Sequence, residues 1–172
     1  MKLAAVIIAV CLASPALSQT ALKPDLAGVG FLVGHWTSDD GKVADTGQTS
    51  KGSSLITVEA NGEALLRRDH TDLFGAKGAA AGGFDQIMLI YPDGGSLRAD
   101  YTDGVHVIHY ASVAVMAGKS VTFTSAPQMS APTFQLRYEM QTPNVIAVTF
   151  AMIPPGQTAL HPIAAGTLKR SE

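Results

Sequence analysis

The stretch FLVGHWTSDDG, Phe31 to Gly41, contains the only tryptophan of a 172-residue chain in which aromatic side chains make up 6% of the residues. Trp36 follows Gly34 by two positions and stands just before the turn-forming residues that begin at Ser38. From this point to the C-terminus, no segment has the apolar spacing of a long helix. We therefore expect an all-β domain that begins near the indole.

Short apolar segments follow one another from Trp36 to the C-terminus, and turn-forming residues separate each from the next. Their alternation of apolar and polar side chains predicts about ten β-strands. The dipeptides Asn61-Gly62 and Asp103-Gly104 predict two-residue hairpin loops, because both residues of such a loop must adopt positive φ. Because the other connections are also short, strands that are neighbours in sequence should be neighbours in the sheet.

The expected sheet must protect its edges. An open antiparallel sheet leaves two edge strands unpaired, and the sequence offers no long helix to cover them. Only the segment from Pro24 to Val33 has nearly helical spacing, and Gly28 and Gly30 limit it to a short turn. We therefore predict an all-β fold, a closed or nearly closed antiparallel meander β-barrel of about ten strands with a short N-terminal helical turn.

The first 18 residues, MKLAAVIIAVCLASPALS, have the pattern of an export signal. Lys2 precedes an apolar run that ends before Ser14, and the small residues Ala16 and Ser18 suit a cleavage site. The run is shorter than the roughly 20 apolar residues that a membrane span needs. Cys11, the only cysteine, would leave with this segment. We therefore predict a signal peptide over residues 1–18, a single barrel domain over residues 19–172, and a mature protein in the periplasm or outside the cell.

Charge and motif content exclude several classes of function. The formal net charge is −2 and the basic residues are scattered, so the sequence does not predict binding to nucleic acid or to an anionic membrane surface. GxSxG, HExxH and phosphate-loop motifs do not occur in it. His106 and His109 are three residues apart, so on a strand they point to opposite faces and cannot share a metal ion. The sequence therefore predicts neither a metal site nor a catalytic centre.

The segment DLAGVGFLVGHW, the nine or so short strands that follow it, and the closing stretch AAGTLKR resemble the calycin superfamily. This superfamily includes lipocalin-like barrels and bacterial nitrobindin-like proteins. The resemblance implies that Trp36 packs across one end of the barrel, and that a basic side chain of the last strand, Lys169 or Arg170, lies over the indole. A cation stacked on an indole contributes about 0.5 to 2 kcal/mol, so we expect these residues to be structural.

The predicted hairpin between residues 97 and 110 supplies the candidate ligand-binding residues. A two-residue loop pairs Tyr101 with His106 and places Tyr110 on the same face. Arg98 lies on the opposite face with Asp100, where an arginine beside a carboxylate could bind an anionic group of a ligand. Neither face is cleanly apolar, so either can line the lumen. The candidates are therefore Arg98, Tyr101, His106 and Tyr110.

Two further segments bear on the lumen. In RRDH, Arg67 and Asp69 share one face of a strand while Arg68 and His70 share the other, and we expect the segment to form an exposed strand face. The segment FGAKGAAAGGF, from Phe74 to Phe84, has no packing side chains between its phenylalanines. This composition favours a flexible lid at the barrel mouth.

Together with the resemblance, these features predict a secreted or periplasmic lipocalin-like barrel that binds a small hydrophobic or amphipathic molecule in its lumen, without a cofactor. Two alternatives stay open. Nitrobindin-like proteins bind haem through one histidine, and His161, just before the last strand, is the corresponding candidate for haem-dependent nitrite or peroxynitrite chemistry. Alternatively, the lumen is filled by the protein's own side chains, and the barrel has a structural or partner-binding role.

Overall fold

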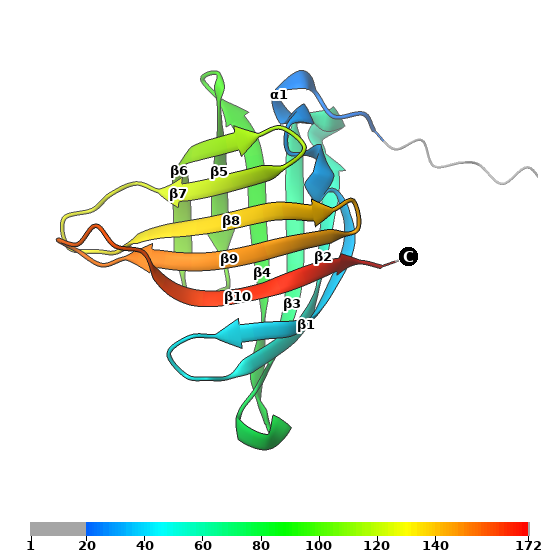
Figure 1. Cartoon of the computed structure of the whole chain (residues 1–172). Coiled ribbons are helices and arrows are strands. Elements are labelled where there is room, and N and C mark those ends of the chain that lie inside the picture. Colours follow the sequence, from blue (N-terminus) through cyan, green and yellow to red (C-terminus); the bar gives the residue numbers. More distant parts are fainter. Residues whose placement is uncertain (1–19, 172) are drawn as a thin grey trace, which may run out of the picture.

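The structure, a computed structural model, describes residues 20–171 and contains one closed β-barrel (Figure 1). Ten antiparallel strands follow one another around the barrel in sequence order, and the last strand pairs with the first. Helix α1 (Pro24–Ala27) and the 3₁₀ turn η1 (Gly30–Leu32) precede them. The predicted all-β meander barrel with a short N-terminal helical turn is therefore confirmed. The predicted signal peptide, residues 1–18, lies outside the described residues.

Every described strand has two hydrogen-bonded neighbours, so the barrel has no free sheet edge within residues 20–171. Strands β7–β10 cross β2–β5 at a steep angle, as in orthogonally packed sheets (Figure 1). The strands are β1 (Gly34–Val43), β2 (Thr49–Glu59), β3 (Ala64–Phe74), β4 (Ala80–Asp93), β5 (Ser96–Thr102), β6 (Val107–Met116), β7 (Ser120–Ser125), β8 (Thr133–Thr142), β9 (Val145–Ile153) and β10 (His161–Arg170). The 3₁₀ turn η2 (Ala60–Gly62) connects β2 to β3, and η3 (Ala76–Gly78) connects β3 to β4.

The N-terminal helical turns close one end of the barrel. No helix within the described residues is long and apolar enough to cross a membrane. Leu26, Val29, Leu32 and Trp36 are fully buried and belong to one core cluster. The indole N–H of Trp36 donates a 2.8 Å hydrogen bond to the Leu32 carbonyl oxygen, which ties the ring to η1. In Figure 1 these turns lie at the end of the barrel opposite the tip of the β3–β4 hairpin.

Two-residue hairpin loops occur at different places from the predicted ones, at Gly94-Gly95 and at Pro143-Asn144. Gly94 and Gly95 form a two-residue loop between β4 and β5, with φ values of 57° and 81°. Glycine adopts positive φ without steric cost, so this pair suits the turn. Asn61-Gly62 also has positive φ, but it lies in a longer loop that contains η2. The prediction of a two-residue loop at Asn61-Gly62 is therefore wrong.

The β5–β6 loop contains four residues, 103–106, instead of the predicted two. Thr102 pairs with Val107, so the predicted register is wrong by two residues along the strand. Because side chains alternate with a period of two, this shift leaves both faces of the hairpin unchanged. His106, however, lies in the loop and not in a strand. The Asp103 side chain holds this loop by accepting hydrogen bonds from the backbone N–H groups of Val105 and His106, at 2.9 and 2.6 Å.

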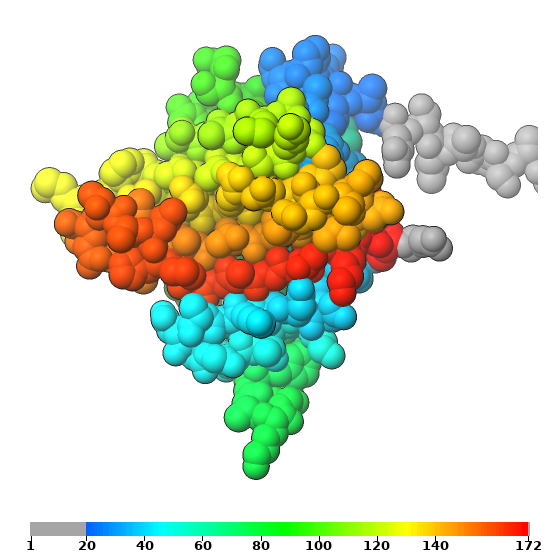
Figure 2. Space-filling model, viewed as in Figure 1, coloured from blue at the N-terminus to red at the C-terminus, as the bar shows by residue number. Residues whose placement is uncertain are grey.

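The glycine-rich segment from Phe74 to Phe84 forms the tip of the β3–β4 hairpin. Phe74 pairs with Ala80 and Asp72 pairs with Gly83, so the two ends of the segment are paired, and residues 75–79 form the turn that contains η3. The tip protrudes from the body of the barrel (Figures 1 and 2). The segment therefore has regular structure where the sequence favoured a flexible lid, and its mobility stays a prediction.

Strands β1 and β10 close the barrel through an interrupted ladder. Regular pairing covers Trp36 and Thr37, and it resumes only at Lys42. In the gap, the Asp40 carboxylate accepts a 2.8 Å hydrogen bond from the Thr167 backbone N–H. A side chain thus replaces part of the backbone pairing at the seam between the first and last strands.

Candidate ligand-binding site

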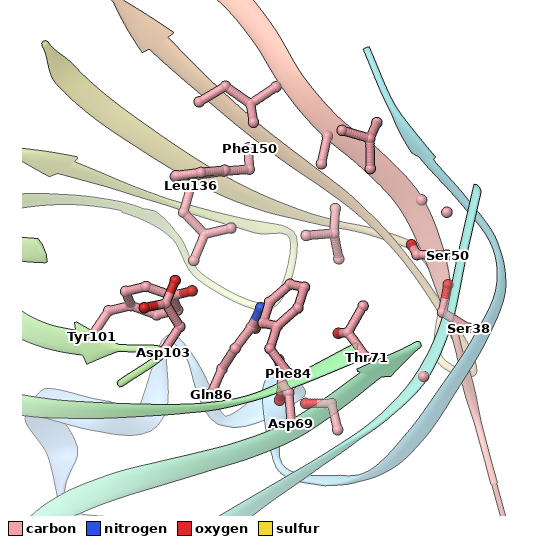
Figure 3. A pocket seen from close by; sticks show the side chains of 18 of the residues that line it. Ser38, Ser50, Asp69, Thr71, Phe84, Gln86, Tyr101, Asp103, Leu136 and Phe150 are labelled. Atoms are coloured by element: carbon pink, nitrogen blue, oxygen red, sulfur yellow. The ribbon is translucent and has the colours of Figure 1, made fainter. Parts of the chain in front are cut away.

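A cavity of about 600 Å³ lies inside the barrel and reaches the end opposite Trp36. Its wall is mostly apolar and includes the rings of Phe134 and Phe150, which stack with centroids 5.7 Å apart. Figure 3 shows Phe84, Leu136 and Phe150 at this wall. Small-molecule sites typically measure about 300–1,000 Å³. The protein's own side chains therefore do not fill the lumen.

A polar cluster centred on Arg67 of β3 forms the floor of the cavity. Arg67 is 5% exposed, and its Nη2 donates hydrogen bonds to Asp69 Oδ2 at 2.7 Å and Gln86 Oε1 at 2.8 Å. Its Nη1 donates to the Tyr138 hydroxyl and lies 3.6 Å from the Met88 sulfur. Arg67 and Asp69 are two residues apart on one strand, so both point inward. The floor thus contains a buried ion pair.

Burial and the ion pair set the charge state of the floor. Burial opposes the charged form of Arg67, but the Asp69 carboxylate, together with Tyr138 and Tyr110, outweighs this effect and raises the pKa of Arg67 above its usual value. Burial raises the pKa of Tyr138 to about 12, and it also raises the pKa of Tyr110 above the ordinary value. At neutral pH the floor therefore contains one guanidinium cation and tyrosine hydroxyls that keep their protons.

Several polar atoms of the floor have no hydrogen-bond partner. Within the described residues these are Ser54 Oγ, Arg67 Nε and Asp69 Oδ1. Tyr110 lines the cavity at 2% exposure, and no group of residues 20–171 hydrogen-bonds to its hydroxyl. Buried polar groups are normally paired, so unpaired ones beside a cavity are typical of a site that a bound molecule or water completes.

A carboxylate stands nearer the mouth, where Asp103 lies beside Tyr101 (Figure 3). Partial burial opposes ionisation of Asp103, but hydrogen bonds from the backbone and ring of His106 lower the pKa of Asp103 to about 2. The ring Nδ1 of His106 lies 3.0 Å from Asp103 Oδ2. Burial raises the pKa of Tyr101 to about 12. This part of the wall is therefore negatively charged at neutral pH.

Three of the four predicted ligand-binding residues line the cavity. Tyr101 and Tyr110 lie in β5 and β6, and His106 lies at the mouth. Arg98 alternates to the outer face of β5, where its Nε is 3.5 Å from Asp93 and its Nη1 donates to the Ala111 carbonyl oxygen. The predicted second face, with Arg98, therefore forms an outer groove and does not belong to the lumen.

His161, the candidate haem ligand, does not line the cavity. It begins β10 as an exposed residue, and its Nε2 lies 3.0 Å from Gln157 Oε1. The part of β10 that lines the cavity begins at Ile163. A lumenal haem bound through His161 therefore does not fit this arrangement. No group of three or more His, Cys, Asp or Glu side chains within residues 20–171 is placed to hold a metal ion.

The floor residues are the ones that the sequence analysis missed. Arg67 and Asp69 were expected on an exposed face, and the structure buries the first and shields the second. Ala64, Leu65 and Leu66 are consecutive apolar residues, so alternation alone does not reveal which face of β3 points inward. The available signal was the spacing of an acid two residues from an arginine, because a buried arginine requires a paired acid.

At the closed end, one of the two basic candidates contacts the tryptophan. The guanidinium carbon of Arg170 lies 4.1 Å from the centroid of the Trp36 ring, and its Nη1 donates a 3.0 Å hydrogen bond to the Val33 carbonyl oxygen. Lys169 points outward instead, with its Nζ 2.9 Å from Asp39 Oδ1. The structure therefore places Arg170 over the indole and Lys169 on the surface.

A similar barrel occurs in a solved structure, the S-type phycobiliprotein lyase CPES from Guillardia theta. The two structures share a TM-score of 0.52 and 10% sequence identity, over 83% of this chain and 89% of that chain. Both chains form a β-barrel, and the barrel of this chain is a closed ten-strand antiparallel meander. At this level of identity the similarity establishes the fold alone. No family model and no curated protein matches the chain.

Proposed function

We propose that this protein binds a small apolar or amphipathic molecule inside its barrel. The observation that carries the proposal is the cavity of about 600 Å³, which combines an apolar wall with a polar floor. Each Å² of apolar ligand surface removed from water contributes about 25 cal/mol, and a few fixed polar groups orient the bound molecule. The calycin-like fold is compatible with such a role.

The ligand enters from the end of the barrel opposite Trp36. Trp36, Leu26 and Leu32 are fully buried at the other end, so they close that route. The cavity reaches Phe84 and His106, which lie at the end opposite Trp36. The apolar part of the ligand then contacts the wall, while its polar part lies at the floor.

We also propose that the barrel works outside the cytoplasm. The N-terminal pattern of residues 1–18 supports export, and the lack of cysteine in the remaining chain means that this barrel needs no disulfide there. Binding in the lumen does not depend on this second proposal.

A matched pair of tryptophan substitutions tests the binding proposal. Val148 lines the cavity, whereas the next residue, Thr149, is exposed on the outer face of β9. We expect the neutral fluorescent probe N-phenyl-1-naphthylamine to bind the wild-type protein. Val148→Trp fills part of the cavity and should weaken binding by about tenfold or more, while Thr149→Trp should bind like the wild type.

Circular dichroism of both variants checks that the barrel has folded. Failure of the wild-type protein to bind the probe would contradict the proposal. Equal weakening by both substitutions would place the probe outside the lumen and would contradict it as well.

A further inference from the structure

The floor of the lumen already contains a charge-balanced pair. The carboxylate of Asp69 neutralises the guanidinium of Arg67 at 2.7 Å, while Gln86 and Tyr138 accept the other hydrogen bonds from the Nη atoms. A carboxylate on a ligand would have to compete with Asp69 for the same donors. It would also place two anions around one cation in a poorly solvated site, which is unfavourable.

The remaining hydrogen-bonding capacity of the floor is mixed and uncharged overall. The Tyr138 hydroxyl accepts from Arg67 and keeps its proton available for donation. Tyr110 offers an unpaired hydroxyl, and Ser54 Oγ, the donor Arg67 Nε and the acceptor Asp69 Oδ1 are buried without partners. Hydroxyl groups can both donate and accept, whereas a carboxylate only accepts. A ligand group that donates and accepts therefore complements these atoms best.

The charge near the entrance of the cavity also favours an uncharged ligand. Asp103 is a carboxylate on the wall between this entrance and the floor, and it is ionised at neutral pH. Lys51 and His70 also border the cavity, but alternation directs their side chains to the outer face. There Lys51 lies 5.8 Å from the centre of the Phe74 ring, and His70 pairs with Asp85. An anionic ligand therefore meets repulsion before it reaches the floor.

We propose that the lumen selects an uncharged amphipathic molecule with a hydroxyl-type polar end, and discriminates against a carboxylate with the same apolar chain. This inference rests on the proposed function, because it concerns the ligand class of the same cavity. The selecting element is the Arg67–Asp69 pair together with the hydroxyls of Tyr110 and Tyr138.

Displacement of N-phenyl-1-naphthylamine by two ten-carbon ligands tests the inference at pH 7.5. We expect 1-decanol to displace the probe at a concentration about tenfold or more below that required for decanoate, which corresponds to about 1.4 kcal/mol. Equal potency, or a preference for decanoate, overturns the inference and leaves ligand binding intact. If the probe itself does not bind, the proposed function fails, and the inference fails with it.

Two isosteric variants identify the selecting element. Asp69→Asn removes the partner charge, so the Arg67 cation is left free to attract a carboxylate, and the preference should shift toward decanoate by tenfold or more. Asp85→Asn makes the same change on the outer face of β4 and should retain the preference for decanol. An unchanged preference in Asp69→Asn overturns the assignment to the floor. Should that variant fail to fold, the comparison of decanol with decanoate in the wild type still decides the inference.

Discussion

At the scale of the residue, Arg67 shows how a charge is accommodated inside an apolar barrel. Removing a guanidinium and a carboxylate from water costs several kcal/mol for each ion, and only close partners offset that cost. Arg67 has three polar partners, Asp69, Gln86 and Tyr138. It also lies 5.9 Å from the centre of the Tyr101 ring. The loss of one partner should therefore be more damaging than the loss of the whole pair.

The Arg67–Asp69 pair can be tested by a double-mutant cycle. Arg67→Met leaves Asp69 without its cation, and we expect it to lower the free energy of unfolding by about 3–5 kcal/mol. The double substitution Arg67→Met/Asp69→Leu removes both charges and should recover most of that loss. Urea denaturation provides the measurement. Two independent, additive losses would show that the pair is not coupled.

The contacts of Trp36 predict a difference between two neighbouring basic residues. Arg170→Met removes the cation from the indole face and should lower the free energy of unfolding by about 0.5–2 kcal/mol. Lys169→Met removes an exposed pair with Asp39 and should leave stability unchanged. Trp36 is the only tryptophan, so its fluorescence during denaturation reports both variants. A larger loss of stability in Lys169→Met than in Arg170→Met would contradict the assignment of Arg170 as the cation over the indole.

Residue patterns predicted part of the candidate site. The two-residue alternation placed Tyr101 and Tyr110 on one face, and this face lines the cavity. The same alternation could not decide which face of β3 points inward, because consecutive apolar residues precede Arg67. Gln86 lies in the neighbouring strand β4, directly opposite Asp69, but Tyr138 comes from β8, and only the closed barrel brings it to Arg67. Contacts across the lumen are thus beyond the reach of local patterns.

At the scale of the element, the β5–β6 hairpin shows how one side chain changes a loop. The Asp-Gly pair predicts a two-residue turn, but the Asp103 carboxylate accepts backbone hydrogen bonds from Val105 and His106. These bonds hold a four-residue loop and shift the strand register by two. The error in register does not change the prediction of which side chains share a face, because a shift by two residues keeps each side chain on its face.

This loop should make stability depend on pH in the acid range. The pKa of Asp103 is lowered from 3.8 to about 2, so the folded state favours the ionised carboxylate. A lowered pKa gives a contribution that is complete above the unfolded value near 3.8 and is lost as pH falls toward 2. We therefore expect Asp103→Ala to destabilise the protein at pH 6 and to match the wild type more closely at pH 2. Urea denaturation at both pH values measures the difference.

If the free energies of unfolding of the wild type and Asp103→Ala differ by the same amount at both pH values, Asp103 is not the group responsible for the pH dependence. Asp45→Ala, in the exposed loop between β1 and β2, serves as a control with the same change of charge. It should leave the pH profile as in the wild type.

At the scale of the whole molecule, the fold was predictable because its determinants are local. Alternating side chains defined the strands, short connections defined the meander, and the lack of covering helices favoured closure. The structure has this closed order of ten strands. Local patterns did not reveal the size of the lumen, because the cavity depends on which side chains meet across the barrel.

The full chain carries one further prediction, on its processing. If residues 1–18 act as a signal peptide, expression with an export system should yield a mature chain that starts at Gln19. N-terminal sequencing or the intact mass of the exported protein measures the cleavage site. A substitution of Ala16 by a large residue should block processing. A chain recovered with Met1 intact in the exported fraction would count against cleavage.

The seam between β1 and β10 has a consequence for biosynthesis. The partner of β1 is β10, the last of the ten barrel strands, so a nascent chain cannot complete the cylinder before β10 has left the ribosome. Until then β1 and β9 both expose unpaired backbone, the surface from which intermolecular aggregates grow. Premature stop codons anywhere before His161 should therefore yield insoluble fragments, and the cell must protect the unfinished chain until β10 is available.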